Sequence, residues 1–469
     1  MRRIVFSCLW MAGVATAVTA AAQQAPPPPS AAAPNDAQLR EIVEAQQRRL
    51  DAQEAVLAEQ QRALQQLRSD LDASPAPAAK AETPAAGLPA LTTSEEAAAA
   101  LEWPGSFAVP GTKSRLKIGG FAEFDAVYDN NAILTPTSFV TNSIVTRDAT
   151  PAQGEDGQAA FSVQPSRLTV EWRMPLSKEQ RVKAFLSIDM FGTSTSASNS
   201  LRVREAYGEV TKVLFGGDLL LGQTWSTFRN NQGVPGTLDF QGPNSVFGVR
   251  HPLARWTKKL GSSPLTLKIA VEAPDKRTLQ NAQALSGVPD GALALVWDTD
   301  GVNLQLSGLV RSLRASVDNA SPISTVGWGA ALAGRIYMPG ALENDFLTFS
   351  VTYGKGIGGV VNDAPLDASY DADDEKLRTL PTFAYYVGYQ HWWTTWLYSV
   401  ACYADVWQDN LAFQAGTSYQ HTRYASLNLA FTPSPAWLFG VEGLYGSRKD
   451  KDDEQGWDAR GLFVSRFIF

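Results

Sequence analysis

The chain has 469 residues, a formal net charge of -7 and a pI near 5.2, which excludes a protein that binds nucleic acid through a basic surface. Charged residues are only 19% of the chain and mean hydropathy is -0.15, so neither an ordinary soluble protein nor a bundle of apolar membrane helices fits. Three His and two Cys leave little material for a zinc site, and we expect no metal and no cofactor.

Residues 1–22 have the three parts of a secretory signal peptide. Arg2 and Arg3 precede a short apolar run, and an Ala-Ala-Ala cleavage site follows it. A membrane anchor is the alternative, but small residues follow the apolar run at once. Cleavage would remove two Arg and no acid, changing the net charge from -7 to -9. It would also remove Cys8 and leave Cys402 without a partner, so we expect no intrachain disulfide.

Three segments of different composition are expected before the main domain. Residues 23–38 are a disordered leader, 39–71 a coiled coil, and 72–104 an Ala- and Pro-rich linker. In the coiled coil, a seam of apolar residues recurs every seven positions and alternates with a second, Gln-containing set. A lone solvated helix is the alternative; the narrow seam favours an oligomer, and we expect a homotrimer. The seam comprises Val43, Leu50, Leu57, Leu64 and Leu71.

The rest of the chain, 105–469, shows alternating apolar and polar residues in segments of about ten, the pattern of membrane-spanning strands. The fold class that we predict is an all-β membrane protein, a sixteen-stranded antiparallel transmembrane β-barrel preceded by an α-helical coiled coil. A soluble β-sandwich is the alternative. The predicted strands are 114–128, 161–174, 181–191, 201–213, 217–225, 247–259, 263–273, 290–298, 301–313, 323–337, 344–355, 379–391, 394–406, 418–432, 436–446 and 457–469.

The lengths of the predicted connections support the barrel. Every second one is short, such as 214–216 and 299–300, whereas the others include 129–160 and 226–246. Outer-membrane barrels have short periplasmic turns and longer outer loops. In the last predicted strand, Phe463 and Phe467 share the face expected to meet lipid. Localisation in the outer membrane of a Gram-negative bacterium, with the coiled coil in the periplasm, follows.

Strand parity places many basic side chains inside the barrel. A barrel of this width leaves a water-filled channel, and rings of Arg and Lys in a pore favour anions. The alternative is that these cations pair with acidic residues of the wall and only solvate it; both interpretations stay open for each residue. The predicted pore-lining residues on strands are Arg167, Arg173, Lys183, Arg202, Arg204, Arg255, Arg311 and Arg335.

The connection 226–246 differs from an ordinary surface loop in its composition. The side chains of Phe228, Leu238 and Phe240 require burial, and Gly and Pro residues introduce turns into the connection. Such a loop can fold into the lumen and narrow it, which makes Arg229 and Asp239 candidates for the constriction. A surface loop remains the alternative.

Two motifs resemble the DcaP-like outer-membrane porins. One is Gly105-Ser-Phe-Ala-Val-Pro-Gly-Thr-Lys-Ser-Arg-Leu-Lys-Ile-Gly-Gly-Phe; the other is Leu221-Gly-Gln-Thr-Trp-Ser-Thr-Phe followed by Pro235-Gly-Thr-Leu-Asp-Phe-Gln-Gly-Pro. The resemblance covers about 105–469 and implies trimers of sixteen-stranded barrels for passive uptake of small anions, notably dicarboxylates and aromatic carboxylates. The Arg on the second and fourth strands match best by position. The uncharged Gly-Val-Pro-Gly run beginning at Gly233 leaves room for a different substrate.

The predicted function is therefore a diffusion porin for small anions, not an enzyme. His251, His391 and His421 are the available imidazole bases, and none lies in a recognisable catalytic motif. A sugar porin with a coiled-coil extension and an outer-membrane anchor tethered to the cell wall are the alternatives. The expected partners are outer-membrane lipids including lipopolysaccharide, small anionic solutes and the cell wall, but not nucleic acid.

Overall fold

The structure, a computed structural model, describes residues 103–193, 199–275, 277–317 and 321–469. They belong to one compact unit, Leu88–Phe469. The predicted signal peptide, leader and coiled coil, and nearly all of the predicted linker, lie outside the described residues.

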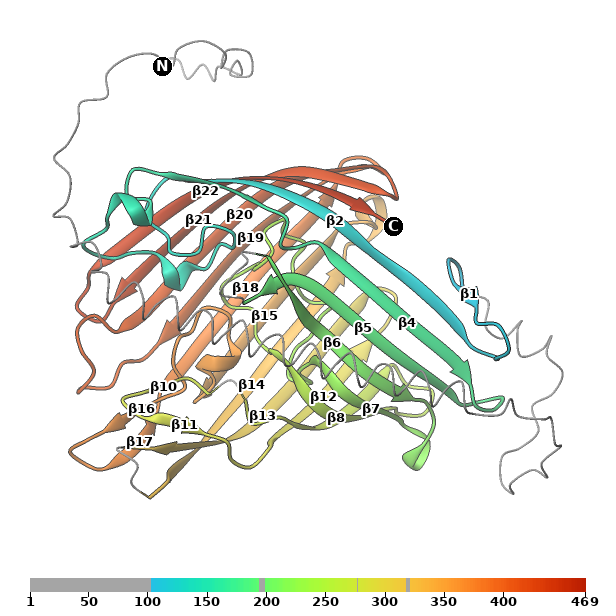
Figure 1. Cartoon of the computed structure of the whole chain (residues 1–469), viewed down its shortest axis with the longest axis horizontal. Helices are drawn as coiled ribbons and strands as arrows, with labels where there is room; N and C mark the ends of the chain where they lie inside the picture. The colour runs from blue at the N-terminus through green and yellow to red at the C-terminus, as the bar shows by residue number, and fades with distance from the viewer. Residues whose placement is uncertain (1–102, 194–198, 276, 318–320) are drawn as a thin grey trace, which may run out of the picture. The chain divides into compact units, whose positions relative to one another are not determined.

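Sixteen long antiparallel strands of the described residues form a closed barrel, as the alternation predicted (Figure 1). Each pairs with its neighbours along the chain, and β2 pairs with β22 to close the wall, with Phe121 opposite Ile468 and Asp129 opposite Arg460. The wall strands are β2 (Arg115–Asp129), β4 (Arg167–Pro175), β5 (Arg181–Gly192), β6 (Ser200–Val210), β7 (Asp218–Trp225), β8 (Arg250–Lys259), β9 (Leu265–Glu272), β12 (Asp290–Asp298), β13 (Val302–Ser316), β14 (Ile323–Tyr337), β15 (Phe346–Lys355), β18 (Pro381–Trp392), β19 (Leu397–Gln408), β20 (Tyr419–Ser434), β21 (Trp437–Asp450) and β22 (Gln455–Ile468).

Short strands and 3₁₀ turns accompany the sixteen wall strands. Three short strands extend the wall, and three others form a separate small sheet in which β10 pairs with β16 and β16 with β17. The first group is β1 (Phe107–Ala108), β3 (Gln158–Ser162) and β11 (Gln283–Leu285); the second is β10 (Leu279–Gln280), β16 (Ala368–Asp371) and β17 (Lys376–Thr379). Single 3₁₀ turns are η1 (Thr141–Ser143), η2 (Pro151–Gln153), η3 (Leu214–Gly216), η4 (Gly340–Leu342) and η5 (Gly358–Val360).

The predicted strand 161–174 is divided in the structure. β3 and β4 both pair with β2, and they are separated by residues 163–166. Pro165 lies in that break, and proline cannot donate a ladder hydrogen bond. The single predicted strand is therefore wrong in this detail, although both parts belong to the same position in the wall.

Strand parity is visible in the exposure of the side chains. On β13, Leu306 and Val310 are 59% and 58% exposed on the outer surface, whereas Gln305 and Arg311 are buried. The same alternation places Leu201 and Val203 outside. An apolar exterior with a polar interior is the arrangement that a lipid environment requires of a barrel.

The connections differ in length at the two ends of the barrel. Residues 176–180, 211–217 and 299–301 are among the turns at one end, and 130–157, 226–249 and 356–380 among the loops at the other. We refer to these as the short-turn end and the long-loop end. Among the described residues, no helix is both long and apolar enough to cross a membrane.

Candidate functional site: an arginine cavity beside an inward-folded loop

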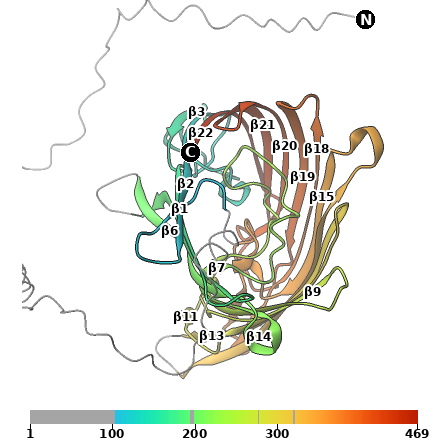
Figure 2. The same cartoon turned by 90° about the vertical axis from the view of Figure 1, so that its right-hand side faces the viewer.

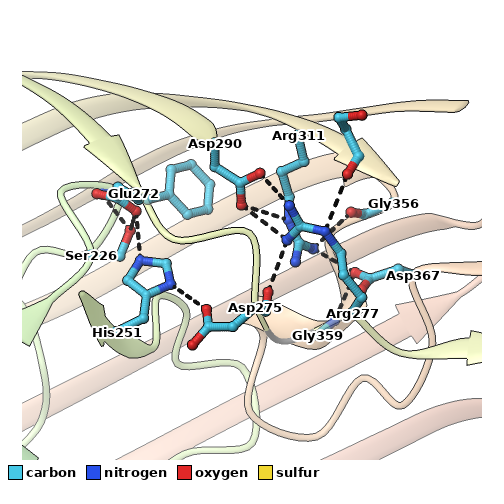
Figure 3. A network of polar contacts seen from close by, with 12 residues as sticks. Ser226, His251, Glu272, Asp275, Arg277, Asp290, Arg311, Gly356, Gly359 and Asp367 are labelled. Carbon is cyan, nitrogen blue, oxygen red and sulfur yellow. Dashed lines mark hydrogen bonds and ion pairs between the residues drawn. The ribbon is translucent and has the colours of Figure 1, made fainter. Parts of the chain in front are cut away.

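The connection from β7 to β8, residues 226–249, folds into the barrel, which decides between the two alternatives that its composition left open. Figure 2 shows chain segments inside the ring of strands. At the base of this inner loop, the Ser226 hydroxyl and the Thr227 backbone N–H donate to the two oxygens of Glu272 on β9, each at 2.7 Å. His251 contacts the same carboxylate at 2.9 Å and Asp275 on its other side (Figure 3). The loop therefore leaves the wall at a fixed angle.

The next part of the inner loop is held by β13. Ser307 donates its hydroxyl to the Phe228 carbonyl at 2.8 Å, and the Asn230 amide donates to the Asn303 side chain at 2.9 Å. The Phe228 ring is fully buried and packs edge-on against Phe247 at 4.9 Å between ring centroids. The apolar Phe228 side chain, which requires burial, is thus buried inside the lumen.

The tip of the inner loop reaches β20 and β21. The backbone N–H groups of Leu238 and Asp239 both donate to one oxygen of Glu442, at 2.8 and 2.7 Å, and the Asn428 amide donates to the Gly236 carbonyl at 3.1 Å. Because these strands are far from β7 in the order of the wall, the loop crosses the lumen and narrows it.

A cavity of about 620 Å³ lies between the inner loop and the wall, towards the long-loop end. Six guanidinium-bearing side chains line it, one from the inner loop and five from strands. Asp239 and Asp275 are the acidic lining residues, so the formal charge of the lining is six minus two, or +4. The six are Arg167 on β4, Arg202 and Arg204 on β6, Arg229 on the loop, Arg250 on β8 and Arg466 on β22.

Only part of this positive charge is neutralised by neighbouring carboxylates. Arg202 makes a bidentate contact with buried Asp189 at 2.9 and 2.6 Å, and Arg204 contacts the same carboxylate at 2.6 Å. Arg466 pairs with Glu123. Within the described ranges, Arg167, Arg229 and Arg250 form no ion pair within 4.0 Å. Asp189 and Glu123 thus pair with three of the six guanidinium groups, and the other three have no ion pair among the described residues.

Several of the guanidinium groups also lie over aromatic rings. Arg229 lies 3.9 Å and Arg250 4.8 Å from the Trp225 ring centroid. Arg167 and Arg466 both lie over Phe121, at 5.2 and 4.6 Å. Stacking on a ring orients a guanidinium without cancelling its charge.

Phe191 on β5 and Phe240 on the inner loop form a third group of aromatic rings beside the guanidinium groups. Phe240 stacks on Phe191 with centroids 4.1 Å apart, and the guanidinium groups of Arg202 and Arg204 lie over the Phe240 ring at 5.9 and 5.3 Å. The inner loop therefore contributes to the cavity through packing as well as through charge.

Burial also acts on the two charged residues of the inner loop. It lowers the pKa of Arg229 to about 10, which leaves the guanidinium protonated at neutral pH. Burial raises the pKa of Asp239 above its ordinary value, while Arg460 at 3.9 Å acts in the opposite direction. The positive charge is thus better preserved than the negative charge of the loop.

Comparison with known proteins identifies the family. The DcaP outer membrane protein family matches residues 90–469. The chain belongs to the DcaP family. It is accordingly an outer-membrane porin, as the two sequence motifs indicated.

One solved structure of a DcaP channel supports the fold, and two other porins show a weaker similarity. The crystal structure of the outer membrane channel DcaP of Acinetobacter baumannii is 20% identical with a TM-score of 0.67, covering 78% of this chain and all of that one. The anion-selective porin from Comamonas acidovorans is 14% identical with a TM-score of 0.49, covering 76% and 100%. OmpT of Vibrio cholerae is 10% identical with a TM-score of 0.48, covering 76% and 98%. No curated protein sequence matches.

In this DcaP-family barrel, five of the ten predicted site residues line the large cavity: Arg167, Arg202, Arg204, Arg229 and Asp239. Sequence reasoning did not select Arg250 or Arg466 for the site. Pro252 obscured the alternation on β8, and pairing of Trp225 with Arg250 was needed to bring that side chain to the cavity.

The other five predicted residues lie elsewhere on the inner wall. Arg173 contacts Glu171 at 2.5 Å and the Trp103 ring at 3.9 Å, and Lys183 contacts Glu209 at 2.5 Å. Arg335 lies over the Phe346 ring near the short-turn end. Arg255 belongs to a second, smaller cavity.

Arg311 is buried within a network of ion pairs (Figure 3). It is 1% exposed and contacts Asp290 at 3.3 Å and Asp367 at 2.6 Å, and Arg277 contacts Asp290 at 2.5 Å. This network joins β12 and β13 to the loop that contains Asp367. Arg311 therefore stabilises the wall and a loop instead of facing the large cavity.

The three His of this DcaP-family chain lie on different strands, each beside its own carboxylate. His251 on β8 contacts Glu272, His391 on β18 contacts Asp345 at 2.6 Å, and His421 on β20 contacts Asp405 at 2.7 Å. In the part of the chain that the structure describes, no cluster of His, Cys, Asp and Glu could hold a metal ion.

Proposed function

We propose that this porin admits small anions, dicarboxylates or aromatic carboxylates, by passive diffusion through the arginine cavity. The observation that carries the proposal is the group formed by Arg167, Arg229 and Arg250, which line one cavity and have no carboxylate partner among the described residues. A permeating carboxylate would supply the missing negative charge.

Recognition would rest on the shape of the guanidinium group. Its planar fork can donate two parallel hydrogen bonds to a carboxylate, which a Lys ammonium cannot match. Nε of Arg167 and one Nη of Arg250 are buried and have no hydrogen-bond partner among the described residues, so protein groups there do not use the full donor capacity of these guanidinium groups. Several weak sites in succession favour conduction, because a pore must release what it binds.

Size selection would come from the inner loop. Its contacts with Glu272, Ser307 and Glu442 hold it across the lumen, so solutes must pass beside it. The cavity of about 620 Å³ leaves room for a small organic acid with some of its water. Transport would need no energy input, because solutes would move down their gradient.

The sugar-porin alternative is less well supported. Sugars in pores bind along exposed aromatic faces, whereas the Trp225 ring is approached by Arg229 and Arg250, and Phe240 by Arg202, Arg204 and Phe191. The rings of the cavity are thus occupied by guanidinium groups and by one another.

We further propose a homotrimer, in which the heptad seam of 39–71 forms a periplasmic coiled coil. Its barrel exterior would meet outer-membrane lipids including lipopolysaccharide, and the coiled coil would approach the cell wall. Removal of residues 23–102 would test this assignment. We expect the truncated channel to conduct normally but to dissociate more readily into monomers on mild heating in detergent. Equal trimer stability would contradict a role for the seam.

Reversal potentials in a planar bilayer under a KCl gradient test the anion proposal. The wild-type channel should be anion selective, and the Arg167→Gln/Arg250→Gln double variant should lose several-fold in the chloride-to-potassium permeability ratio. Lys258→Gln is the matched control, because Lys258 is on β8 but donates to the Phe215 carbonyl at the short-turn end. Cation selectivity in the wild type, or an unchanged ratio in the double variant, would overturn the proposal.

A further inference from the structure

A second, smaller cavity lies on the other side of the inner loop. Its volume is about 300 Å³, and its lining includes residues 226–227 and 229–232 of the loop and inward-facing residues of β8, β9, β12 and β13. Thr266 and Asp298 of this lining lie at the ends of their strands that lead into short turns. The small cavity is therefore towards the short-turn end, the periplasmic end in outer-membrane barrels.

The small cavity also contains cations without carboxylate partners. The Arg255 guanidinium on β8 donates only to the Trp225 carbonyl, at 3.3 Å, and forms no ion pair within the described ranges. The side-chain ammonium of Lys268 on β9 forms neither a hydrogen bond nor an ion pair with any described residue. With Arg229 the lining has three positive charges against one from Asp298, which leaves +2.

Asp298 does not cancel this charge. Its carboxylate accepts a hydrogen bond from the Asn303 amide at 2.9 Å and forms no ion pair with Arg255 or Lys268 at 4.0 Å or less. Two like charges placed on adjacent strands of the wall, β8 and β9, repel one another in a confined space. A bound anion would relieve that repulsion.

Arg229 connects the two cavities, because it lines both. Its Nε donates to the Asn231 side chain at 2.7 Å, and its guanidinium stacks on Trp225. The residue is thus held by a neutral partner and a ring at the boundary between the cavities. An anion leaving the large cavity would meet the same guanidinium on entering the small one.

We infer that Arg255 and Lys268, together with Arg229, form a second binding site for one small carboxylate on the periplasmic side of the inner loop. This inference rests on the proposed anion function and divides the path into two successive sites. The wall groups on either side of the loop are different residues, so each site can be changed without altering the other.

The two sites can be separated by blocking from opposite sides of a bilayer. Succinate is the probe, and the reduction of chloride current gives its apparent dissociation constant from each side. Sidedness is assigned with an Asp300→Cys substitution in an exposed short turn, treated with a charged, membrane-impermeant thiol reagent. The native Cys402 is buried, so it does not compete for the reagent.

We expect Arg255→Gln/Lys268→Gln to weaken block from the short-turn side at least five-fold and from the long-loop side less than two-fold. The Arg167→Gln/Arg250→Gln variant should show the reverse, and Lys258→Gln should change neither. Reversal potentials measured on each variant establish that an open channel is present.

The outcomes distinguish the two proposals. An anion-selective wild type in which Arg255→Gln/Lys268→Gln weakens block equally from both sides, or from neither, overturns the second site alone. A wild type that is not anion selective overturns the anion function, and the second site with it.

Discussion

Arg250 and Arg311 both project from wall strands into the barrel, yet their surroundings are opposite. Arg311 is fully buried between Asp290 and Asp367, whereas Arg250 lines an open cavity with no carboxylate within 4.0 Å among the described residues. Identical side chains on the same face of one barrel thus join a buried ion-pair network in one region and line a cavity without an ion pair in the other. The carboxylate partner, and not inward position, therefore distinguishes the two arginines, and the proposed function assigns the attraction of anions to the second kind.

The largest expected effect is on the buried network. Arg311→Gln would leave Asp367 without its guanidinium partner and Asp290 with Arg277 alone, and breaking a buried pair costs about 3–5 kcal/mol of folding free energy. Urea unfolding in detergent micelles, followed by tryptophan fluorescence, measures this. Arg250→Gln is the matched change in the cavity and should leave the midpoint nearly unchanged. Equal destabilisation of both variants would remove the distinction between the regions.

Asp189 offers a way to enlarge the difference. Asp189→Asn would remove the charge shared by Arg202 and Arg204, so anion selectivity should rise by roughly two- to five-fold. The same change should cost roughly 1–3 kcal/mol of stability, because a buried hydrogen-bonded charge is lost. Reversal potentials and urea midpoints provide the two measurements. Lower anion selectivity would mean that Asp189 serves mainly to position the two arginines.

The long loops should respond to pH through Asp363. Burial raises the pKa of its carboxyl from 3.8 to about 6, although Thr141 donates to it from its backbone N–H and its hydroxyl, each at 2.6 Å. A raised pKa means that the stabilising contribution is present at acidic pH and is lost as pH rises through about 6. Asp363 should therefore contribute about 1 kcal/mol more to the stability of the fold at pH 5 than at pH 7.

Asp363→Asn is the control for this dependence. The amide stays neutral throughout, so the variant should lose the difference between the two pH values in urea unfolding. A persistent difference would assign the pH response to another carboxyl.

The smallest effect is expected at Arg173, which sequence parity had placed among the pore-lining residues. Its side chain is 38% exposed and pairs with Glu171 on the same strand. Exposed pairs contribute less than about 1 kcal/mol, so Arg173→Gln should hardly move the urea midpoint. The reversal potential of the Arg173→Gln variant should stay within error of the wild type. A clear fall in its anion selectivity would show that the selective region extends towards the short-turn end.

The sequence was sufficient to predict the strands of the wall and which of their side chains face the lumen or the lipid. Alternation placed Arg202 and Arg204 inside, and both reach Asp189 even though a register shift lies between Ser187 and Ile188. Long apolar-polar alternation survives such a local irregularity, because the lipid-facing residues on either side still specify the outer surface. Pro165, in contrast, ended a strand that alternation alone would have continued.

Side-chain contacts between residues far apart in the sequence could not be predicted from the sequence. Arg311 and Arg250 cannot be distinguished along the chain, because Asp367 is 56 residues from Arg311 and reaches it only through a folded loop. The same limit hid the contribution of Glu442, which holds the tip of the inner loop from a position 203 residues away from Asp239. Local patterns predict the face on which a residue lies, and tertiary contacts decide its neighbours.

The inner loop holds its position through side chains that belong to the wall. Glu272, Ser307 and Glu442 are donors or acceptors to its backbone, while its own side chains Arg229 and Phe240 line the large cavity. Backbone contacts tolerate sequence change in the loop better than side-chain contacts would. The barrel can therefore act as a fixed frame in which evolution, or a protein engineer, exchanges the inner-loop residues that line the cavity without redesigning the strands.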